Sequence, residues 1–317
     1  RTTAALVADA VGCTEDEVLV ASTGVIGVQL DLGPFKTGIP AALAAATPAG
    51  GASAARAIMT TDTHPKECAV TFAGDEIGYP GITFTVGGMA KGSGMIMPNM
   101  ATMISVLTTD APIAAPDLAS ALRRAVDASF NKVTVDSDTS TNDTCFALAS
   151  GAAAPAGARF AAGTPAFEAF ERALLQVCTA LARAMAADGE GATKLVTVNV
   201  RGAASDADAD AAARTVANSP LTKTAIYGHD ANWGRIAGAL GRSGARFVQE
   251  NVDIDIMGMP VCRDGLALVF DEDEALRRFE EPEIVIDVDL GAGDASTTIW
   301  TCDLSHEYVT INGDYRS

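Results

Sequence analysis

The sequence has few of the residues that usually build metal sites and disulfide frameworks. It contains three histidines and six cysteines in 317 residues, and no two cysteines form a CxxC pair. Because the cysteines lie far apart, a zinc knuckle is not expected. Buried free thiols are the simpler interpretation, and they fit a reducing, cytoplasmic compartment. The sequence therefore predicts no bound metal.

Positive charge is also scarce. Lysine and arginine together number 22, against 40 aspartates and glutamates, which gives a formal net charge of −18. A field of that sign repels phosphate backbones, so nucleic acid is not an expected partner. The acidic residues are scattered along the chain, which indicates a solvated surface rather than an acidic tail.

Long apolar runs are absent as well. No uninterrupted stretch reaches the roughly 20 residues that a bilayer-spanning helix needs, so no membrane partner is expected. The chain begins at Arg1 without a charged-then-apolar leader, so no secretory signal is expected either. With 48% hydrophobic and 20% charged residues, the composition is ordinary for a soluble globular protein.

Helix-like and strand-like patterns alternate along the first two thirds of the chain. Residues 117–133 and 165–187 place apolar side chains at spacings of three and four, and the second pattern ends at Gly189. Residues 82–86 and 194–200 have the composition of strands. This alternation predicts an α/β fold.

The pattern changes after Gly241, where strand candidates follow one another with short acidic turns between them. We therefore expect a smaller β-rich C-terminal lobe over about residues 241–310.

One segment combines many glycines with a single lysine. Residues 86–103 read VGGMAKGSGMIMPNMATM. A phosphate-binding P-loop needs Gly-Lys followed directly by Ser or Thr, whereas Gly92 follows Lys91 here. A solvated surface loop is the plainer alternative, but the many methionines make the segment too apolar for one.

This segment resembles the signature of the ornithine acetyltransferase (glutamate N-acetyltransferase) family, whose members cleave themselves before a threonine that follows alanine. Other stretches resemble the family too, and together they span nearly the whole chain in the family's order. They are STGVIG at 22–27, MTTDT at 59–63, DTSTNDT at 138–144, DGEGATKL at 188–195, NSPL at 218–221, KTA at 223–225, DANWGR at 230–235, and Tyr308, Val309, Asn312 and Tyr315.

The resemblance departs from the family at both ends. Family members normally carry a further N-terminal stretch before STGVIG, and most of it is absent here. The family's last position is commonly threonine and is Ser317 in this sequence.

The resemblance implies an α/β fold of the kind that ornithine acetyltransferases share with related self-processing aminopeptidases. It would be a sandwich with a smaller β-rich lobe. Cleavage between Ala101 and Thr102 would leave an α fragment, residues 1–101, and a β fragment, residues 102–317. Two copies of each would form an α2β2 heterotetramer.

The same resemblance implies ping-pong transfer of acetyl from N2-acetylornithine to glutamate, with no cofactor. Thr102 would be the nucleophile. A free α-amine has a pKa of about 7.7–8.0 and can accept the hydroxyl proton of its own residue, so one residue can supply both nucleophile and base. An uncleaved threonine at this position would be an ordinary strand residue.

The remaining site residues also come from the resemblance. Thr23 and Gly24 would form the oxyanion hole, although an ordinary turn at the end of a strand is the alternative for this pair. Lys91 would contact the substrate, whose α-carboxylate suits a cation, rather than lie solvated in a loop. The other expected substrate contacts are Thr61, Thr102, Glu190, Asn312 and Ser317.

Three other readings remain open at this point. The enzyme could also accept acetyl-CoA, as a bifunctional enzyme would. An N-terminal-nucleophile aminopeptidase or amidase could use the same scaffold, because only the acceptor differs. An inactive binding homologue is the third reading, and the Ala101–Thr102 pair, Lys91 and Glu190 argue against it.

A cluster of aspartates could be mistaken for a metal site. Asp136, Asp138 and Asp143 lack the glycine and closing glutamate of a calcium loop. We therefore expect them to serve in turns and caps.

Overall fold

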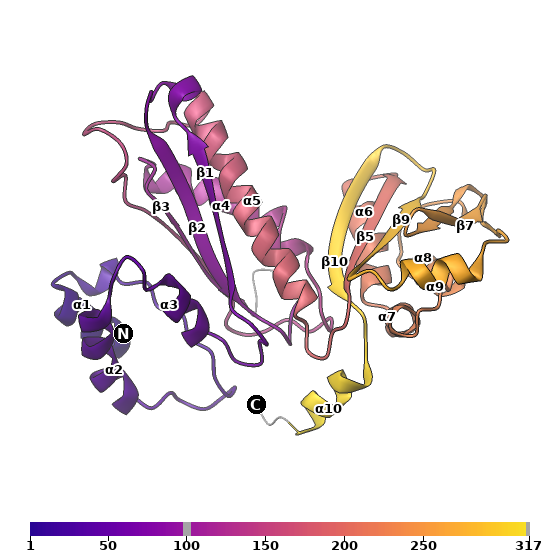
Figure 1. The fold of residues 1–317 in the computed structure, drawn as a ribbon, viewed down its shortest axis with the longest axis horizontal. Coiled ribbons are helices and arrows are strands. Elements are labelled where there is room, and N and C mark those ends of the chain that lie inside the picture. Colours follow the sequence, from indigo (N-terminus) through magenta and orange to yellow (C-terminus); the bar gives the residue numbers. More distant parts are fainter. Residues whose placement is uncertain (98–102, 315–317) are drawn as a thin grey trace.

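The fold is a mixed α/β architecture with two lobes and an N-terminal helical region. The structure is a computed structural model, and it describes residues 1–97 and 103–314. Figure 1 shows the two lobes side by side, with the N-terminal helices beside the first lobe. The last helix lies near the centre, where the two lobes approach each other (Figure 1). The predicted α/β class is confirmed.

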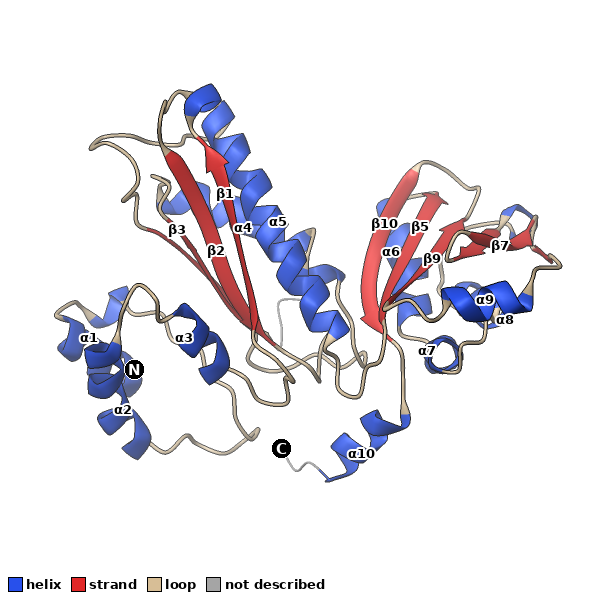
Figure 2. Ribbon diagram, viewed as in Figure 1, coloured by secondary structure: helices blue, strands red, loops and turns tan. Residues whose placement is uncertain are grey.

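The first lobe is built on a four-stranded sheet of order β1-β2-β3-β4. The pairs β1/β2 and β2/β3 are antiparallel, and β3/β4 is parallel. Helices α4 and α5 cover one face of this sheet (Figure 2). The elements are β1 (Lys66–Ala73), β2 (Thr83–Lys91), β3 (Ile104–Thr109), β4 (Thr144–Ala149), α4 (Ala115–Asp127) and α5 (Pro165–Ala187).

Helix α5 has the bounds that the sequence predicts. The Thr164 side chain accepts a hydrogen bond from the backbone N–H of Phe167, and Pro165 occupies the first turn. Its apolar stripe is buried against the sheet and includes Cys178, Leu181 and Met185. The helix therefore anchors the core of the first lobe and delivers the residues after Ala187 to one edge of the sheet.

The second lobe has its own sheet, of order β10-β5-β9-β6-β7-β8, and its own hydrophobic core. The range predicted for the smaller lobe, about 241–310, supplies β6 to β10, whereas β5 and helices α6 to α8 precede it. The strands are β5 (Leu195–Ala203), β6 (Asp253–Ile256), β7 (Met259–Arg263), β8 (Leu266–Ala267), β9 (Glu283–Asp289) and β10 (Ala295–Cys302). The helices that follow these strands or connect them are α6 (Asp206–Ala217), α7 (Pro220–Tyr227), α8 (Trp233–Gly241), α9 (Glu272–Arg278) and α10 (His306–Asp314).

The N-terminal region consists of α1 (Thr2–Val11), α2 (Gly33–Ala45) and α3 (Gly51–Ala57). The apolar run at 18–21, just before Thr23, has the composition of a strand but no regular secondary structure. A strand needs a partner for its backbone groups, and the structure pairs none with this run among the described residues. Several of its apolar side chains are exposed, including Leu19 and Val20.

Short 3-10 helices complete the described chain. They cover Glu15–Glu17, Asp75–Ile77, Phe130–Lys132 and Gln249–Asn251. Among the described residues, no helix is long and apolar enough to cross a membrane.

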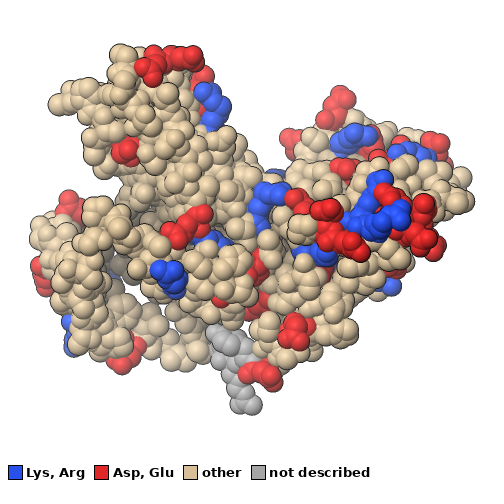
Figure 3. Space-filling view, in the orientation of Figure 1, with Lys and Arg blue, Asp and Glu red and all other residues tan. Residues whose placement is uncertain are grey.

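Charged side chains are unevenly distributed on the face seen in Figure 3. Lysine, arginine, aspartate and glutamate gather mainly over the second lobe, and the first lobe shows few of them. Many of the charges on the second lobe are paired, as Arg277 and Arg278 are with Glu274. The acidic residues visible on this face of the second lobe thus belong to a solvated surface.

Candidate active site

Four chain segments reach the same edge of the first sheet. Strand β2 ends at Lys91 directly beside the start of β3 at Ile104, because the antiparallel pair joins these two residues. The parallel register pairs Ile104 with Thr144, so the segment before β4 arrives at the same edge. The residues that follow α5 arrive there as well, since Glu190 donates its backbone N–H to the Ser93 carbonyl at 2.9 Å.

A cavity of about 250 Å³ opens at this edge. Six predicted site residues line it together, although they lie far apart in the sequence. Ala101, Thr102 and Ser317 lie outside the described residues. The lining residues are Thr23, Gly24, Val25, Ile26, Thr60, Thr61, Lys91, Gly94, Met95, Ser140, Asn142, Glu190 and Asn312.

Lys91 supplies the cavity with a cation. The residue is 5% exposed, and the structure gives its ammonium no hydrogen bond to any described residue. Burial lowers the pKa of Lys91, the nearby Lys66 lowers it further, and Asp62, Asp143 and Glu190 act in the opposite direction. An ammonium that lines a cavity with donors left over can bind an anion there.

Glu190 brings a carboxylate to the same cavity. Its side chain accepts a hydrogen bond at 2.8 Å from the amide of Asn312, which α10 places there. The last helix therefore reaches the cavity through Asn312. A cation and a carboxylate in one small cavity match the two charges of an amino acid.

Gly94 makes room for this carboxylate. A Cβ atom built on Gly94 would lie 2.3 Å from Oε2 of Glu190, which is far inside van der Waals contact. We expect Gly94→Ala to displace the Glu190 carboxylate and to lower kcat/KM about tenfold, because small misplacements of binding groups are costly.

The matched control for this substitution is Gly87→Ala, on the same strand-and-loop segment. A Cβ on Gly87 would meet its nearest neighbours at 3.9 Å, an ordinary contact. Steady-state kinetics and thermal unfolding of both variants check the prediction. Equal activity of the two variants would contradict the role given to Gly94.

Thr23 and Gly24 line the cavity from an exposed segment without regular structure. The amide of Asn142 donates a hydrogen bond at 2.8 Å to the Ser22 carbonyl and ties this segment to the one before β4. Sequence reasoning assigned no role to Asn142 or Ser140. Their only signal was membership of the stretch at 138–144.

Asp136 acts as the predicted turn residue. Its carboxylate accepts hydrogen bonds from the backbone N–H groups of Met95 at 2.6 Å and Ile96 at 3.0 Å. Met95 has a φ of 54°, which is uncommon for a residue other than glycine. Asp136 therefore holds the glycine-rich segment in an unusual backbone conformation beside the cavity.

The environment of Asp143 differs from that of the turn or cap residue that the sequence predicted. Neither of its buried carboxylate oxygens has a hydrogen-bond partner among the described residues. Burial raises the pKa of Asp143 to about 7, and the backbone N–H of Met103 and the charge of Lys91 oppose that shift. A carboxyl group with such a pKa can take up or release a proton near neutral pH.

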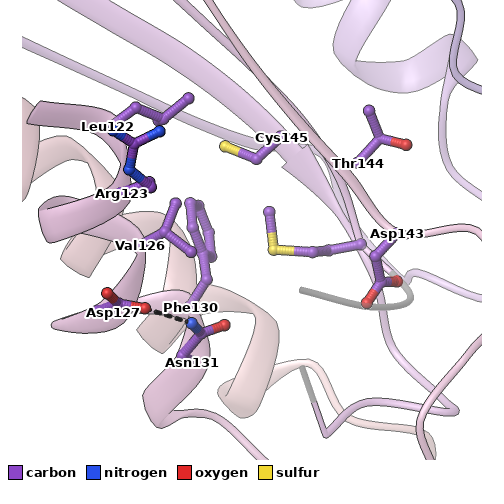
Figure 4. Close-up of a pocket in the computed structure, with 10 residues that line it drawn as sticks. Leu122, Arg123, Val126, Asp127, Phe130, Asn131, Asp143, Thr144 and Cys145 are labelled. Carbon is purple, nitrogen blue, oxygen red and sulfur yellow. Dashed lines mark hydrogen bonds between the residues drawn. The ribbon is translucent and has the colours of Figure 1, made fainter. Parts of the chain in front are cut away.

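Asp143 also lies at one end of a second, mostly apolar cavity of about 220 Å³, between α4 and β4. Figure 4 shows Leu122, Val126, Phe130 and Cys145 around that cavity, with Asp143 at the side away from α4. Asp143 therefore lines this cavity, whereas its neighbour Asn142 lines the one that contains Lys91 and Glu190.

The aspartates do not assemble a metal site. Within residues 1–97 and 103–314, no three His, Cys, Asp or Glu side chains are grouped so that they could hold a metal ion.

Known proteins resemble this chain along its whole length. The ArgJ family model matches residues 1–317. An "arginine biosynthesis bifunctional protein ArgJ" from Symbiobacterium thermophilum is 51% identical over 99% of this chain and 76% of its own length. The protein of the same name from Chlorobium chlorochromatii is 49% identical over 98% of this chain and 70% of its own length.

A solved structure agrees with the sequence matches. The crystal structure of "arginine biosynthesis bifunctional protein argJ" from Bacillus halodurans is 43% identical, with a TM-score of 0.65. The match covers 68% of this chain and all of the solved chain. This chain therefore belongs to the ArgJ family.

Proposed function

We propose that this chain is a glutamate N-acetyltransferase that moves acetyl from N2-acetylornithine to glutamate. The family and the names of its relatives support an acetyltransferase of arginine biosynthesis. The observation that carries the substrate class is the small cavity in which the Lys91 ammonium, which has no hydrogen bond to a described residue, lies with the Glu190 carboxylate. Such a cavity suits a zwitterionic amino acid, with the substrate carboxylate at Lys91 and a substrate ammonium at Glu190.

The chemistry would start with self-cleavage between Ala101 and Thr102. The new α-amine takes the hydroxyl proton of Thr102. The Thr102 hydroxyl oxygen then attacks the acetyl carbonyl carbon of the donor. The bond between the acetyl carbon and nitrogen breaks, and ornithine leaves with the proton. Glutamate then attacks the acetyl ester through its amine and restores the Thr102 hydroxyl.

The negative charge that develops on the acetyl oxygen needs donors. Thr23 and Gly24 line the cavity, and the Thr23 hydroxyl and the Gly24 N–H are the proposed pair. Removing one such donor typically lowers the rate by about 10²–10³-fold.

Two observations support a two-fragment enzyme. The solved relative matches over its full length yet covers 68% of this chain, and residues 102–317 make up the same share of the 317 residues. The antiparallel register also pairs Lys91, in the proposed α fragment, with Ile104, near the start of the proposed β fragment. We propose fragments 1–101 and 102–317, assembled as an α2β2 heterotetramer.

The proposal extends to the acetyl donor and the compartment. The relatives are named bifunctional proteins, and acetyl-CoA as a second donor would give this chain two activities. All six cysteines are free, which supports a reducing cytoplasmic location.

Incubation with N2-acetylornithine alone tests the proposed function. We expect intact-mass measurement to show one added acetyl group on the fragment that begins at Thr102. Glutamate should remove that group faster than water, because a bound amine is held in line with the ester. Rapid loss to water without dependence on glutamate would favour an aminopeptidase or amidase. Intersecting double-reciprocal plots and no acetylated fragment would remove Thr102 from the nucleophile's role.

A further inference from the structure

A lysine at the start of β1 is fully buried between two carboxylates. The ammonium of Lys66 lies 2.7 Å from Oδ1 of Asp62 and 2.5 Å from Oδ2 of Asp188, and the Lys66 side chain has no exposed surface. Sequence reasoning assigned no role to Lys66. The three residues come from the loop after α3, the first residue of β1 and the end of α5.

The Asp62 carboxylate holds together two segments of the cavity that Lys91 and Glu190 line. It accepts hydrogen bonds from the backbone N–H groups of Thr60 at 3.2 Å and of Gly92 at 2.8 Å. Thr60 precedes the cavity residue Thr61, and Gly92 follows Lys91. One carboxylate therefore fixes two cavity segments that are thirty residues apart in the chain.

Asp188 contacts the same two segments as Asp62. Its carboxylate accepts hydrogen bonds from the N–H of Thr63, at 3.0 Å, and from the Thr63 hydroxyl. Its backbone carbonyl accepts a hydrogen bond from the Ser93 hydroxyl at 2.6 Å. Because Ser93 also accepts the N–H of Glu190, the segment that carries Glu190 is fixed to the glycine-rich loop.

Stability alone does not account for this arrangement. Taking three charged groups out of water is costly, and replacing buried ion triads with apolar residues is often neutral or stabilising. The backbone hydrogen bonds of both carboxylates are directed to segments that line the cavity. A role in the site therefore explains the triad of Lys66, Asp62 and Asp188 better than a role in folding.

The triad also contributes to the charge around Lys91. The charged groups that act on this ammonium come from each element packed around it. They are Asp62 in the loop after α3, Lys66 on β1, Asp143 before β4 and Glu190 after α5. Lys66 is the cation among them, and it disfavours the charged form of Lys91.

We propose that Lys66, held by Asp62 and Asp188, is a positioning residue of the acetyltransferase site. It fixes the segment after α3 and the glycine-rich loop through its carboxylate partners, and it adds a positive charge near the cation that receives the substrate carboxylate. This inference rests on the proposed function.

The pH profile of kcat/KM gives the test. The α-amine of Thr102 must be deprotonated, which sets the acidic limb, and Lys91 must be protonated, which sets the alkaline limb. Lys66→Met removes a positive charge near Lys91, so we expect the alkaline limb to move to higher pH. Asp62→Asn removes a negative charge there, so the limb should move to lower pH. Both variants should lower kcat/KM at neutral pH by about 10- to 100-fold, because the cavity walls shift.

Asp188→Asn is the matched control. It removes a carboxylate of the same triad that acts on Lys91 less strongly than Asp62 and Lys66 do. We expect it to lower kcat/KM with a smaller shift of the alkaline limb than in either of the other variants. If Lys66→Met does not yield folded protein, Lys66→Met combined with Asp188→Asn is compared with Asp188→Asn alone, since the double variant buries one carboxylate fewer.

We expect the alkaline limb to shift in opposite directions in the Lys66 and Asp62 variants. A purely structural disruption would not give pH shifts of opposite sign in the two variants. Shifts of the same sign, or no shift in either folded variant, would overturn the inference while the wild type still transfers acetyl. A wild-type protein without acetyl transfer would instead overturn the proposed function.

Discussion

Thr102→Ala is expected to leave one full-length chain on a denaturing gel and to lower acetyl transfer by about 10⁴-fold or more. Alanine offers no hydroxyl for the attack on the Ala101 carbonyl or on the acetyl group, so both reactions lose their nucleophile. Removal of a catalytic nucleophile in a comparable covalent mechanism has effects of this size or larger. Gel electrophoresis and a transfer assay with N2-acetylornithine and glutamate measure the two losses.

Two further variants make this result specific. Thr102→Ser keeps a hydroxyl and should retain part of both activities. Thr108→Ala changes an exposed threonine on β3 and should cleave and transfer normally. A Thr102→Ala protein that still yields two fragments would show that another residue performs the cleavage.

The sequence predicted local structure best where one segment carries all of its own signals. Helix α5 has an N-cap threonine, a proline in its first turn, a continuous apolar stripe and a terminal glycine, and its bounds match the prediction. The strand predicted at 82–86 continues to Lys91 because its later residues pair with both β1 and β3. That extension depends on partners that a local pattern does not reveal.

Sheet membership could not be predicted for the same reason. Strand β5 lies between β10 and β9, although about eighty residues separate β5 from β9 in the chain. The run at 18–21 has the composition of a strand but no partner among the described residues. Composition gives the tendency to form a strand, and only tertiary contacts decide whether one forms.

The candidate site was predicted through resemblance rather than through local chemistry. Thr23, Lys91 and Asn312 lie in different parts of the chain, and no spacing rule would have grouped them. The unpartnered carboxylate of Asp143 and the buried ion pairs of Lys66 were not predicted, because both depend on burial, and burial is a property of the folded chain. The space required at Gly94 is likewise visible only once Glu190 is placed beside it.

Lys91→Met is expected to lower kcat/KM by roughly 10²- to 10³-fold, with little loss of fold stability. Truncating one partner of a buried, hydrogen-bonded charge pair typically costs about 2–5 kcal/mol, because the other charge stays unpaired. In the proposed complex that other charge is the substrate carboxylate. Methionine has a similar length and no charge, so the variant removes the interaction with little change in packing.

Stability should respond in the opposite direction to activity. Because burial lowers the pKa of Lys91 below its value in the unfolded chain, the charged form opposes folding. That opposition is present at pH values below the folded pKa and decreases as the pH rises through it. An uncharged methionine does not carry this unfavourable contribution to folding. The Lys91→Met protein should therefore unfold at the same temperature as the wild type, or at a higher one, at neutral pH. Lys36→Met, at an exposed position, is the control for the loss of one lysine charge.

A change of substrate then identifies the group that Lys91 contacts. With an acetylornithine analogue whose carboxylate is replaced by a neutral amide, the wild type should lose most of its kcat/KM, because Lys91 no longer meets an anion. The Lys91→Met protein should use the two substrates nearly equally, since the interaction energy in this double-mutant cycle belongs to the ammonium–carboxylate pair. If the variant still prefers the carboxylate as strongly as the wild type does, another cation binds it. Lys91 would then act on the reacting groups rather than on the substrate carboxylate.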